Sequence, residues 1–320
     1  MCVPTLDDLG SFFDWFKRER FDGVEGVICF ETNKPGPVLG ITACTHGNEP
    51  SGLAAIKNLL DINVQKLLKR GTIFLAVNNI RAAERYFSAS TDEEKSKARS
   101  TDHNMNRLPE DMLSDQNSDR YEIVRAQALY PIWQKFTVGF DVHTTRRDSP
   151  PMIISGRDKF QRDLVRGFPI EIVISNIDVV QIGLPAFGFY GGVDSGIPVF
   201  EIEAGAHEKP ESFRRAIECA LALLKNLKMI EGRTKPLVDE YLEYFIDGSV
   251  VFSNNSYEQS RIFENFEFVS KGTIFATGDA VPVLRAPFDC HTIFCNIKLK
   301  PDTIAEEVMF LSRPVRKLSA

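Results

Sequence analysis

Strand-like and helix-like segments alternate over the first two thirds of the chain, and this alternation is what most constrains the fold. Residues 38–44 form a short apolar run with β-branched side chains, typical of a strand buried on both faces. Residues 51–60 carry apolar side chains at helical spacing, behind a proline that suits a helix start. Further strands are expected at residues 72–77, 136–142 and 199–202, and a further helix at residues 119–136. The pattern predicts an α/β fold with a mixed, mostly parallel sheet flanked by helices.

The pattern of predicted secondary structure changes at about residue 235. Short strand-like runs follow at residues 248–252, 263–269, 273–276, 280–284 and 292–299, with turn residues between them. The predicted helix at residues 212–229 and the Gly/Pro-containing segment at residues 232–236 mark a boundary. We therefore expect a larger α/β domain at residues 1–234 and a smaller all-β C-terminal domain at residues 235–320.

Composition and charge narrow the class of protein. The 320 residues are 43% hydrophobic and 26% charged, which excludes a disordered or fibrous chain. The net charge is −6, and no basic run offers a surface for nucleic acid. The first twenty residues mix acidic and basic side chains, unlike a secretory signal, and no apolar stretch is long enough for a membrane span. We expect a cytoplasmic protein without nucleic-acid or membrane partners; whether it forms a homo-oligomer stays open.

Two histidines stand where predicted strands end. His46 directly follows the strand at residues 38–44, Glu49 comes three residues later, and His143 ends the strand at residues 136–142. In open α/β sheets, ligands bind beyond the carboxyl ends of the strands, so these side chains are expected to converge. Two histidines and one carboxylate, with a fourth position open for water, are typical of catalytic zinc. The sequence predicts one zinc per chain held by these residues, with Asp141 as a candidate to orient His143.

Acidic and basic side chains suited to a polar substrate surround these motifs. Glu201 and Glu203 lie near the end of the strand at residues 199–202 and share one face, so strand parity does not choose between them. Residues 88–119 form a long polar excursion, which is unusual inside a compact domain unless it is functional. It contains Asn106 and Arg107, and arginine offers a planar fork that matches a carboxylate. We predict that Arg107 binds substrate.

Four motifs in this order resemble a known family. They are His-Gly-Asn-Glu-Pro at residues 46–50, Asn-Met-Asn-Arg at 104–107, Phe-Asp-Val-His-Thr-Thr at 140–145 and Glu-Ile-Glu-Ala-Gly at 201–205. Together they resemble the succinylglutamate desuccinylase/aspartoacylase family, a branch of the zinc carboxypeptidase superfamily. The β-rich C-terminal segment is also similar to the architecture of that family. The resemblance implies a zinc-carboxypeptidase-like α/β fold.

The resemblance also implies roles for single residues. His46, Glu49 and His143 would hold the zinc ion, and Glu203, rather than Glu201, would be the general base. Asn106 and Arg107 would bind a substrate carboxylate.

Two further arginines are implied by the same resemblance. Arg85, in an Arg-Tyr dipeptide, would polarise the scissile carbonyl, with Arg99 as its competitor because extra residues separate Arg85 from Asn106. Arg147, four residues after His143, would meet an acidic group of the substrate.

The function expected from these residues is that of a zinc-dependent hydrolase, a deacylase. It would cleave the amide bond of an N-acyl amino acid or a similar small carboxylate-bearing amide, with Glu203 acting on the attacking water. One alternative is a zinc carboxypeptidase that acts on peptide C-termini, since the same metal site serves that chemistry. A further alternative is a non-catalytic protein that keeps a relic metal site.

Overall fold

The structure is a computed structural model that describes residues 2–109, 111–112, 114–115, 117–155, 161–186, 197–296, 298 and 307–319. The helices are α1 Leu6–Phe16, α2 Ser51–Asp61, α3 Val64–Leu67, α4 Ile80–Ser88, α5 Asp92–Lys97, the 3-10 helix η1 Met105–Arg107, α6 Tyr121–Trp133, α7 Arg162–Val165, α8 Ile177–Val180 and α9 Pro210–Asn226. Among the described residues, no helix combines the length and the apolar character that a membrane crossing requires.

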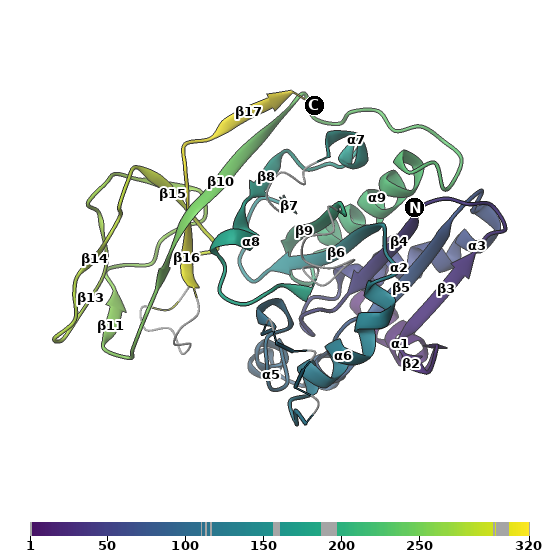
Figure 1. The fold of residues 1–320 in the computed structure, drawn as a ribbon, viewed down its shortest axis with the longest axis horizontal. Coiled ribbons are helices and arrows are strands. Elements are labelled where there is room, and N and C mark those ends of the chain that lie inside the picture. Colours follow the sequence, from purple (N-terminus) through teal and green to yellow (C-terminus); the bar gives the residue numbers. More distant parts are fainter. Residues whose placement is uncertain are drawn as a thin grey trace.

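The strands of the larger part form one mixed sheet. They are β3 Val27–Glu31, β4 Val38–Ala43, β5 Thr72–Val77, β6 Val138–Thr145, β7 Met152–Ser155, β8 Ile172–Ser175 and β9 Val199–Ala206, and β1 Arg20–Phe21 pairs separately with β2 Val24–Glu25. Along the sheet the order is β8, β7, β9, β6, β4, β5, β3 (Figure 1). The pairs β5–β4, β4–β6 and β6–β9 are parallel, whereas β3 and β7 run antiparallel to β5 and β9. The prediction of a mixed, mostly parallel sheet is confirmed.

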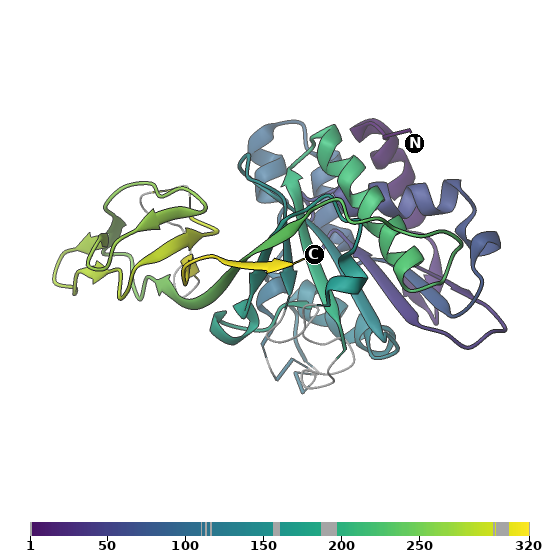
Figure 2. The same cartoon turned by 90° about the horizontal axis from the view of Figure 1, so that it is seen from above.

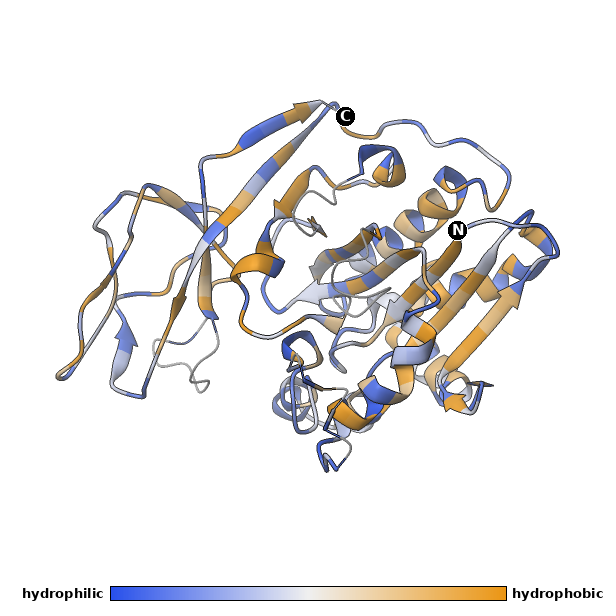
Figure 3. Cartoon of the chain, in the orientation of Figure 1, coloured by the Kyte–Doolittle hydropathy of each residue, from blue (hydrophilic) through white to orange (hydrophobic). Residues whose placement is uncertain are grey.

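Helices cover both faces of this sheet (Figure 2). On one face α1, α2 and α9 bury the apolar side chains of β4, β5, β6 and β9, among them Ile41, Leu75 and Phe140. On the other face α6 packs through Leu129 and Trp133. The central strands are apolar along nearly their whole length (Figure 3), as strands covered on both faces must be. The charged ends of β6 and β9 are therefore exceptions within an apolar layer.

The C-terminal segment adds antiparallel strands. They are β10 Glu240–Val251, β11 Tyr257–Gln259, β12 Glu267–Val269, β13 Ile274–Gly278, β14 Leu284–Arg285, β15 Cys290–Ile293, β16 Glu307–Ser312 and β17 Arg316–Ser319. β10 is long enough to serve both parts: its first half pairs with β8 and β17, and its second half pairs with β16 (Figure 1). The two parts of the chain thus share a strand, and the boundary at residue 235 stays a prediction.

Several predicted element bounds are wrong. β6 and β9 continue past the predicted ends at residues 142 and 202, because the residues that follow still pair with each other across the two strands. In the C-terminal segment the predicted strand at 263–269 is reduced to β12, and the one at 280–284 to β14, which begins only at its last residue. The apolar side chains there, such as Phe263, fill a small core from loops. Of the predicted strand at 292–299, residues 297 and 299 lie outside the described part.

Close packing around β4 generates a test of the fold. A Cβ atom on Gly40 would lie 2.0 Å from Cε2 of Phe136, a ring that is fully buried between the sheet and α6. We expect Gly40→Ala to lower the free energy of unfolding by about 3 kcal/mol, because the ring has no space to move into. Gly248→Ala on β10 is the matched control, since its new Cβ would meet Leu311 at an ordinary 3.8 Å. Urea titration of both variants measures the difference, and equal stability would contradict the packing.

Candidate metal centre

The turn between β4 and α2 carries the first two residues of the site. Cys44 leaves the strand with a left-handed φ of 52°, which bends the chain sharply. Gly47 then lies so close to α4 that a Cβ atom would meet the carbonyl carbon of Ala82 at 2.2 Å, so only glycine fits. The bend brings His46 and Glu49 together, with His46 Nδ1 2.9 Å from Glu49 Oε1.

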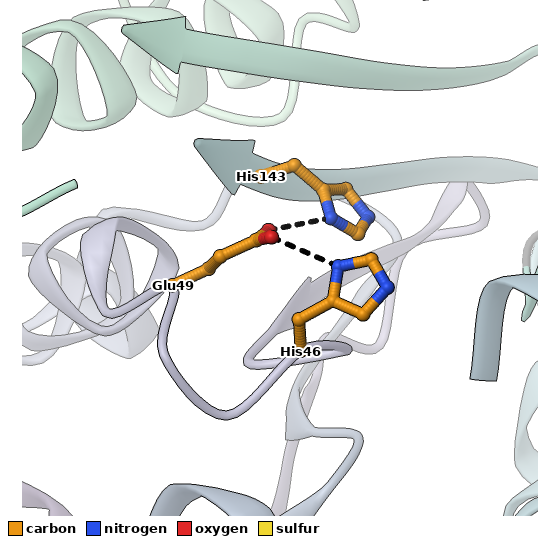
Figure 4. A group of neighbouring side chains, drawn as sticks. All are labelled: His46, Glu49 and His143. Atoms are coloured by element: carbon orange, nitrogen blue, oxygen red, sulfur yellow. Dashed lines mark hydrogen bonds and ion pairs between the residues drawn. The ribbon is translucent and has the colours of Figure 1, made fainter. Parts of the chain in front are cut away.

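His143 completes a buried cluster with these two residues. It extends from β6, and its Nδ1 lies 2.8 Å from the other carboxylate oxygen of Glu49, so that Glu49 lies between the two imidazoles (Figure 4). His46, Glu49 and His143 are 3%, 2% and 2% exposed. Their ligand atoms all lie within 4.8 Å of one another. The structure thus brings together the three side chains predicted to hold a metal ion.

The remaining ring nitrogens are held by neighbours. His46 Nε2 lies 2.9 Å from Asn104 Oδ1, and His143 Nε2 lies 3.1 Å from Asp141 Oδ2. Asp141 in turn accepts hydrogen bonds from the hydroxyl groups of Thr42, at 2.7 Å, and Thr45, at 2.6 Å. Such partners fix the orientation of an imidazole and, in metal sites, the nitrogen that faces the ion. Both rings here direct Nδ1 at the carboxylate of Glu49.

Burial and charge perturb these groups strongly. Burial, assisted by Arg99, lowers the pKa of His46 to about 4. Burial also disfavours a charge on His143, but the carboxylates around it, Asp141 first, hold its pKa well above the ordinary value. Burial would raise the pKa of Glu49, yet the two imidazoles outweigh it and hold that pKa well below its usual range. The charge on Glu49 is therefore stabilised by the imidazoles on either side of it.

The two glutamates of β9 face this cluster. Strand pairing sets Glu203 directly opposite His143, and Glu201 Oε1 lies 3.4 Å from Asn106 Nδ2. Among the described residues, no group donates a hydrogen bond to the buried Oε2 of Glu203. Burial, with the charge of Glu49, raises the pKa of Glu203 to about 8, and burial raises that of Glu201 to about 7. Carboxylates tuned in this direction are suited to proton transfer near neutral pH.

Of the two arginines predicted for the scissile carbonyl, the structure brings Arg99 to the cluster. Arg99 Nη1 lies 2.8 Å from Glu49 Oε1, and its side chain lines the same hollow as Glu203. Arg85 lies on the exposed face of α4 and lines a separate hollow against α1. The next residue, Tyr86, is buried, so the phase of the helix turns Arg85 outward.

The three predicted substrate-binding residues lie around the cluster, and the two arginines among them form ion pairs with glutamates. Asn106 and Arg107 line one hollow, where Arg107 Nε and Nη2 lie 3.1 and 3.0 Å from Glu307 Oε2. Arg147 lines a second hollow, and its Nη1 lies 3.1 Å from Glu264 Oε2. Both glutamates come from the C-terminal segment, which therefore contributes to the walls of the site.

Two cavities of about 220 Å³ each flank the cluster. Arg99 and Glu203 line both of them, so they stand at the point where the cavities meet. A small molecule that spans the two cavities would have its middle beside Glu203 and its ends against different walls.

Sequence reasoning missed two residues of the site. Asn104 contacts His46, and its position two residues before Asn106 in the same short motif was the available signal. Glu307 contacts Arg107 from β16, and no local pattern marks it, because the two residues are 200 positions apart. For the role at the scissile carbonyl, the sequence offered one signal for Arg99 over Arg85: Arg99 lies in the same polar segment, residues 88–119, as Asn106.

Comparisons with known proteins identify the family of this chain. The family model described as succinylglutamate desuccinylase/aspartoacylase catalytic domain matches residues 35–215, more than half of the 320 residues. A search of curated proteins found no match.

Solved structures share the fold at low sequence identity. Succinylglutamate desuccinylase from Vibrio cholerae is 16% identical, with a TM-score of 0.69 over 91% of this chain and 86% of that one. The enzyme of that name from Vibrio parahaemolyticus is 16% identical, with a TM-score of 0.66 over 92% and 90%. The product-bound ectoine utilization protein EutE (DoeB) from Ruegeria pomeroyi is 15% identical, with a TM-score of 0.57 over 92% and 87%. The chain belongs to the succinylglutamate desuccinylase/aspartoacylase family.

Proposed function

We propose that the protein is a zinc-dependent deacylase that cleaves the amide bond of a small N-acyl amino acid. The observation that carries this proposal is the buried cluster of His46, Glu49 and His143 beside Glu203. Family membership supports a deacylase, and the cluster supports the metal. The two flanking cavities are small, which favours a compact substrate over a long peptide.

The donor atoms fit zinc. Two imidazole nitrogens and one carboxylate form the three-ligand set found in catalytic zinc sites, which keep a fourth position open. The other nitrogen of each ring is already engaged, by Asn104 and by Asp141, as is usual for histidines that bind a metal. Arg99 contacts one oxygen of the buried Glu49 carboxylate, and a metal ion would add positive charge between that carboxylate and the two imidazoles.

The residues of the chain then have defined tasks. Zinc, when bound, polarises a carbonyl and lowers the pKa of water to near neutrality. Glu203 accepts a proton from the attacking water and returns it to the nitrogen of the leaving amine, so that water and amide become a carboxylic acid and an amine. Arg99, which reaches the same two cavities, stabilises the negative charge that develops on the carbonyl oxygen. Asn106 and Arg107 hold the substrate on one side, and Arg147 holds it on the other.

The metal set is tested by zinc content. We expect elemental analysis to find about one zinc per chain in the parent, and little in a His46→Ala/His143→Ala variant, because the site loses two of three ligands. His291→Ala is the matched control, since this histidine lies on β15 and has no contact with the cluster among the described interactions. Equal zinc content in the parent and the double variant would contradict the assignment.

The general base is tested by an isosteric change. We expect Glu203→Gln to lower kcat by roughly a hundredfold to ten-thousandfold while the zinc content stays at the parental level, because the amide cannot accept the proton. Glu201→Gln is the matched variant on the same face of β9. It should lose less, since Glu201 lines one of the two cavities whereas Glu203 lines both. A larger loss in Glu201→Gln would exchange the two roles.

The two arginines can be separated in the same assay. We expect Arg99→Gln to lower kcat by about a hundredfold or more, the usual result of removing one donor to a developing oxyanion. Arg85→Gln should change kcat by less than about threefold, because its side chain points into a different hollow. Steady-state hydrolysis of N-acetyl amino acids by zinc-loaded protein measures both variants. The reverse order of effects would return the role to Arg85.

A further inference from the structure

Glu122 is a fully buried carboxylate in the first turn of α6. Its Oε1 accepts hydrogen bonds from the side-chain amide of Asn79 and from the backbone N–H of Thr101. Its Oε2 accepts from the backbone N–H groups of Asp102 and His103, at 3.0 Å each. A buried charge is costly unless it is hydrogen-bonded, and here four neutral donors stabilise it.

The three backbone donors belong to the loop that carries Arg99 and Asn104. Residues 101–104 form no helix or strand, so Glu122 supplies the acceptors that regular secondary structure provides elsewhere. In return, Asp102 Oδ2 accepts the backbone N–H of Tyr121 at the start of α6, at 3.0 Å. The loop and the helix therefore hold each other by reciprocal contacts.

Both ends of this loop reach the metal cluster. Arg99 Nη1 lies 2.8 Å from Glu49 Oε1, and Asn104 Oδ1 lies 2.9 Å from His46 Nε2. The segment that Glu122 holds lies between these two contacts. Because α6 packs against the sheet, Glu122 joins the loop to a rigid part of the fold.

The position of Arg99 matters for its proposed task. A misplacement of about 1 Å can cost about a hundredfold in rate, since an oxyanion donor must meet the developing charge at hydrogen-bond distance. The side chain of Arg99 is 47% exposed, so packing around it does not fix its place. Its backbone carbonyl accepts a hydrogen bond from Gly47 at 3.0 Å, and the next fixed point along the loop is the contact with Glu122.

We infer that Glu122 is a positioning residue: it fixes residues 101–103 from α6, so that Arg99 reaches the substrate carbonyl and Asn104 orients His46. The inference rests on the proposed function for the identity of the reaction. Glu122 is not among the described residues that line the two cavities, so it acts through the loop and not on the substrate.

Glu122→Gln is the most direct test, because it keeps the size of the side chain. Whichever way the amide is turned, its NH2 group faces two of the four donors and cannot accept from them. We expect kcat of the zinc-loaded protein for N-acetyl amino acids to fall by about tenfold to a hundredfold. A folded Glu122→Gln protein with the parental kcat would overturn the inference.

Arg125→Gln is the matched control. Arg125 is also buried on α6, and it donates to the backbone carbonyl oxygens of residues 25, 77 and 78, away from the loop. It should lower the thermal stability, as Glu122→Gln does, but keep kcat within about threefold of the parent. An equal loss of kcat in both variants would assign the effect to the stability of the helix and overturn the inference.

A double-mutant cycle tests whether Glu122 acts through Arg99. The two side chains have separate partners, the loop backbone and Glu49. If the loop links them, Glu122→Gln should cost at least about threefold less in an Arg99→Gln background than in the parent. Losses that multiply unchanged would show independent roles and overturn the inference.

Hydrogen exchange and zinc affinity give readouts that do not depend on turnover. The amides of residues 101–103 should exchange at least about tenfold faster in Glu122→Gln, and at the parental rate in Arg125→Gln. The Kd for zinc, measured by competition with a chelator, should rise by about tenfold, because Asn104 would no longer orient His46. Parental exchange rates in Glu122→Gln would overturn the inference, and a parental Kd would overturn the role assigned through Asn104.

These readouts separate the inference from the proposed function. If the parent hydrolyses no N-acyl amino acid, the proposed activity is wrong, while hydrogen exchange still decides whether Glu122 fixes the loop. Glu122→Asp replaces Glu122→Gln if the latter does not fold. It keeps the charge but draws both oxygens back by one C–C bond, so kcat should fall and exchange should rise in the same directions. Parental values of both in a folded Glu122→Asp protein would overturn the inference.

Discussion

Parallel pairing of β4, β6 and β9 determines where the chemistry of this chain lies. Three strands that run in the same direction end at one edge of the sheet, and each delivers polar side chains there: His46 beyond β4, His143 on β6 and Glu203 on β9. The register between β6 and β9, which sets His143 opposite Glu203, places a prospective ligand beside a prospective base. Most of the charged side chains at this edge are buried, which explains why they perturb one another so strongly.

Charge compensation is the second condition that the site must meet. Glu49, Asp141, Glu201 and Glu203 all lie at or near the cluster, and Arg99 contacts Glu49 directly. Part of the compensation without a metal falls on His143, which explains the opposite directions of the pKa shifts of the two histidines. A divalent cation would relieve the same imbalance, since it binds the carboxylate and neutral imidazoles together.

The fold and the core of the site could be predicted because their signals are local. Apolar runs mark β4 and β5. A histidine that follows a strand of a parallel sheet lies at the carboxyl edge of that sheet, where ligands bind. The arginines were harder, because helix phase decides their direction: Arg85 and Tyr86 are adjacent in sequence, yet one is exposed and the other buried. The place of Glu307 beside Arg107 could not be predicted, because it depends on how segments 200 residues apart pack together, and sequence periodicity carries no information on that.

Strand β10 carries a consequence for the autonomy of the two parts. Its first half closes the edge of the large sheet against β8, and its second half forms a ladder with β16, the strand that begins with Glu307 (Figure 1). A cut at residue 235 would leave β8 with an open edge, a feature that invites aggregation. It would also remove Glu307, which contacts Arg107. The C-terminal segment is thus required for the structure of the larger part. A chain truncated at this border, or the larger part grafted onto another protein, is expected to aggregate.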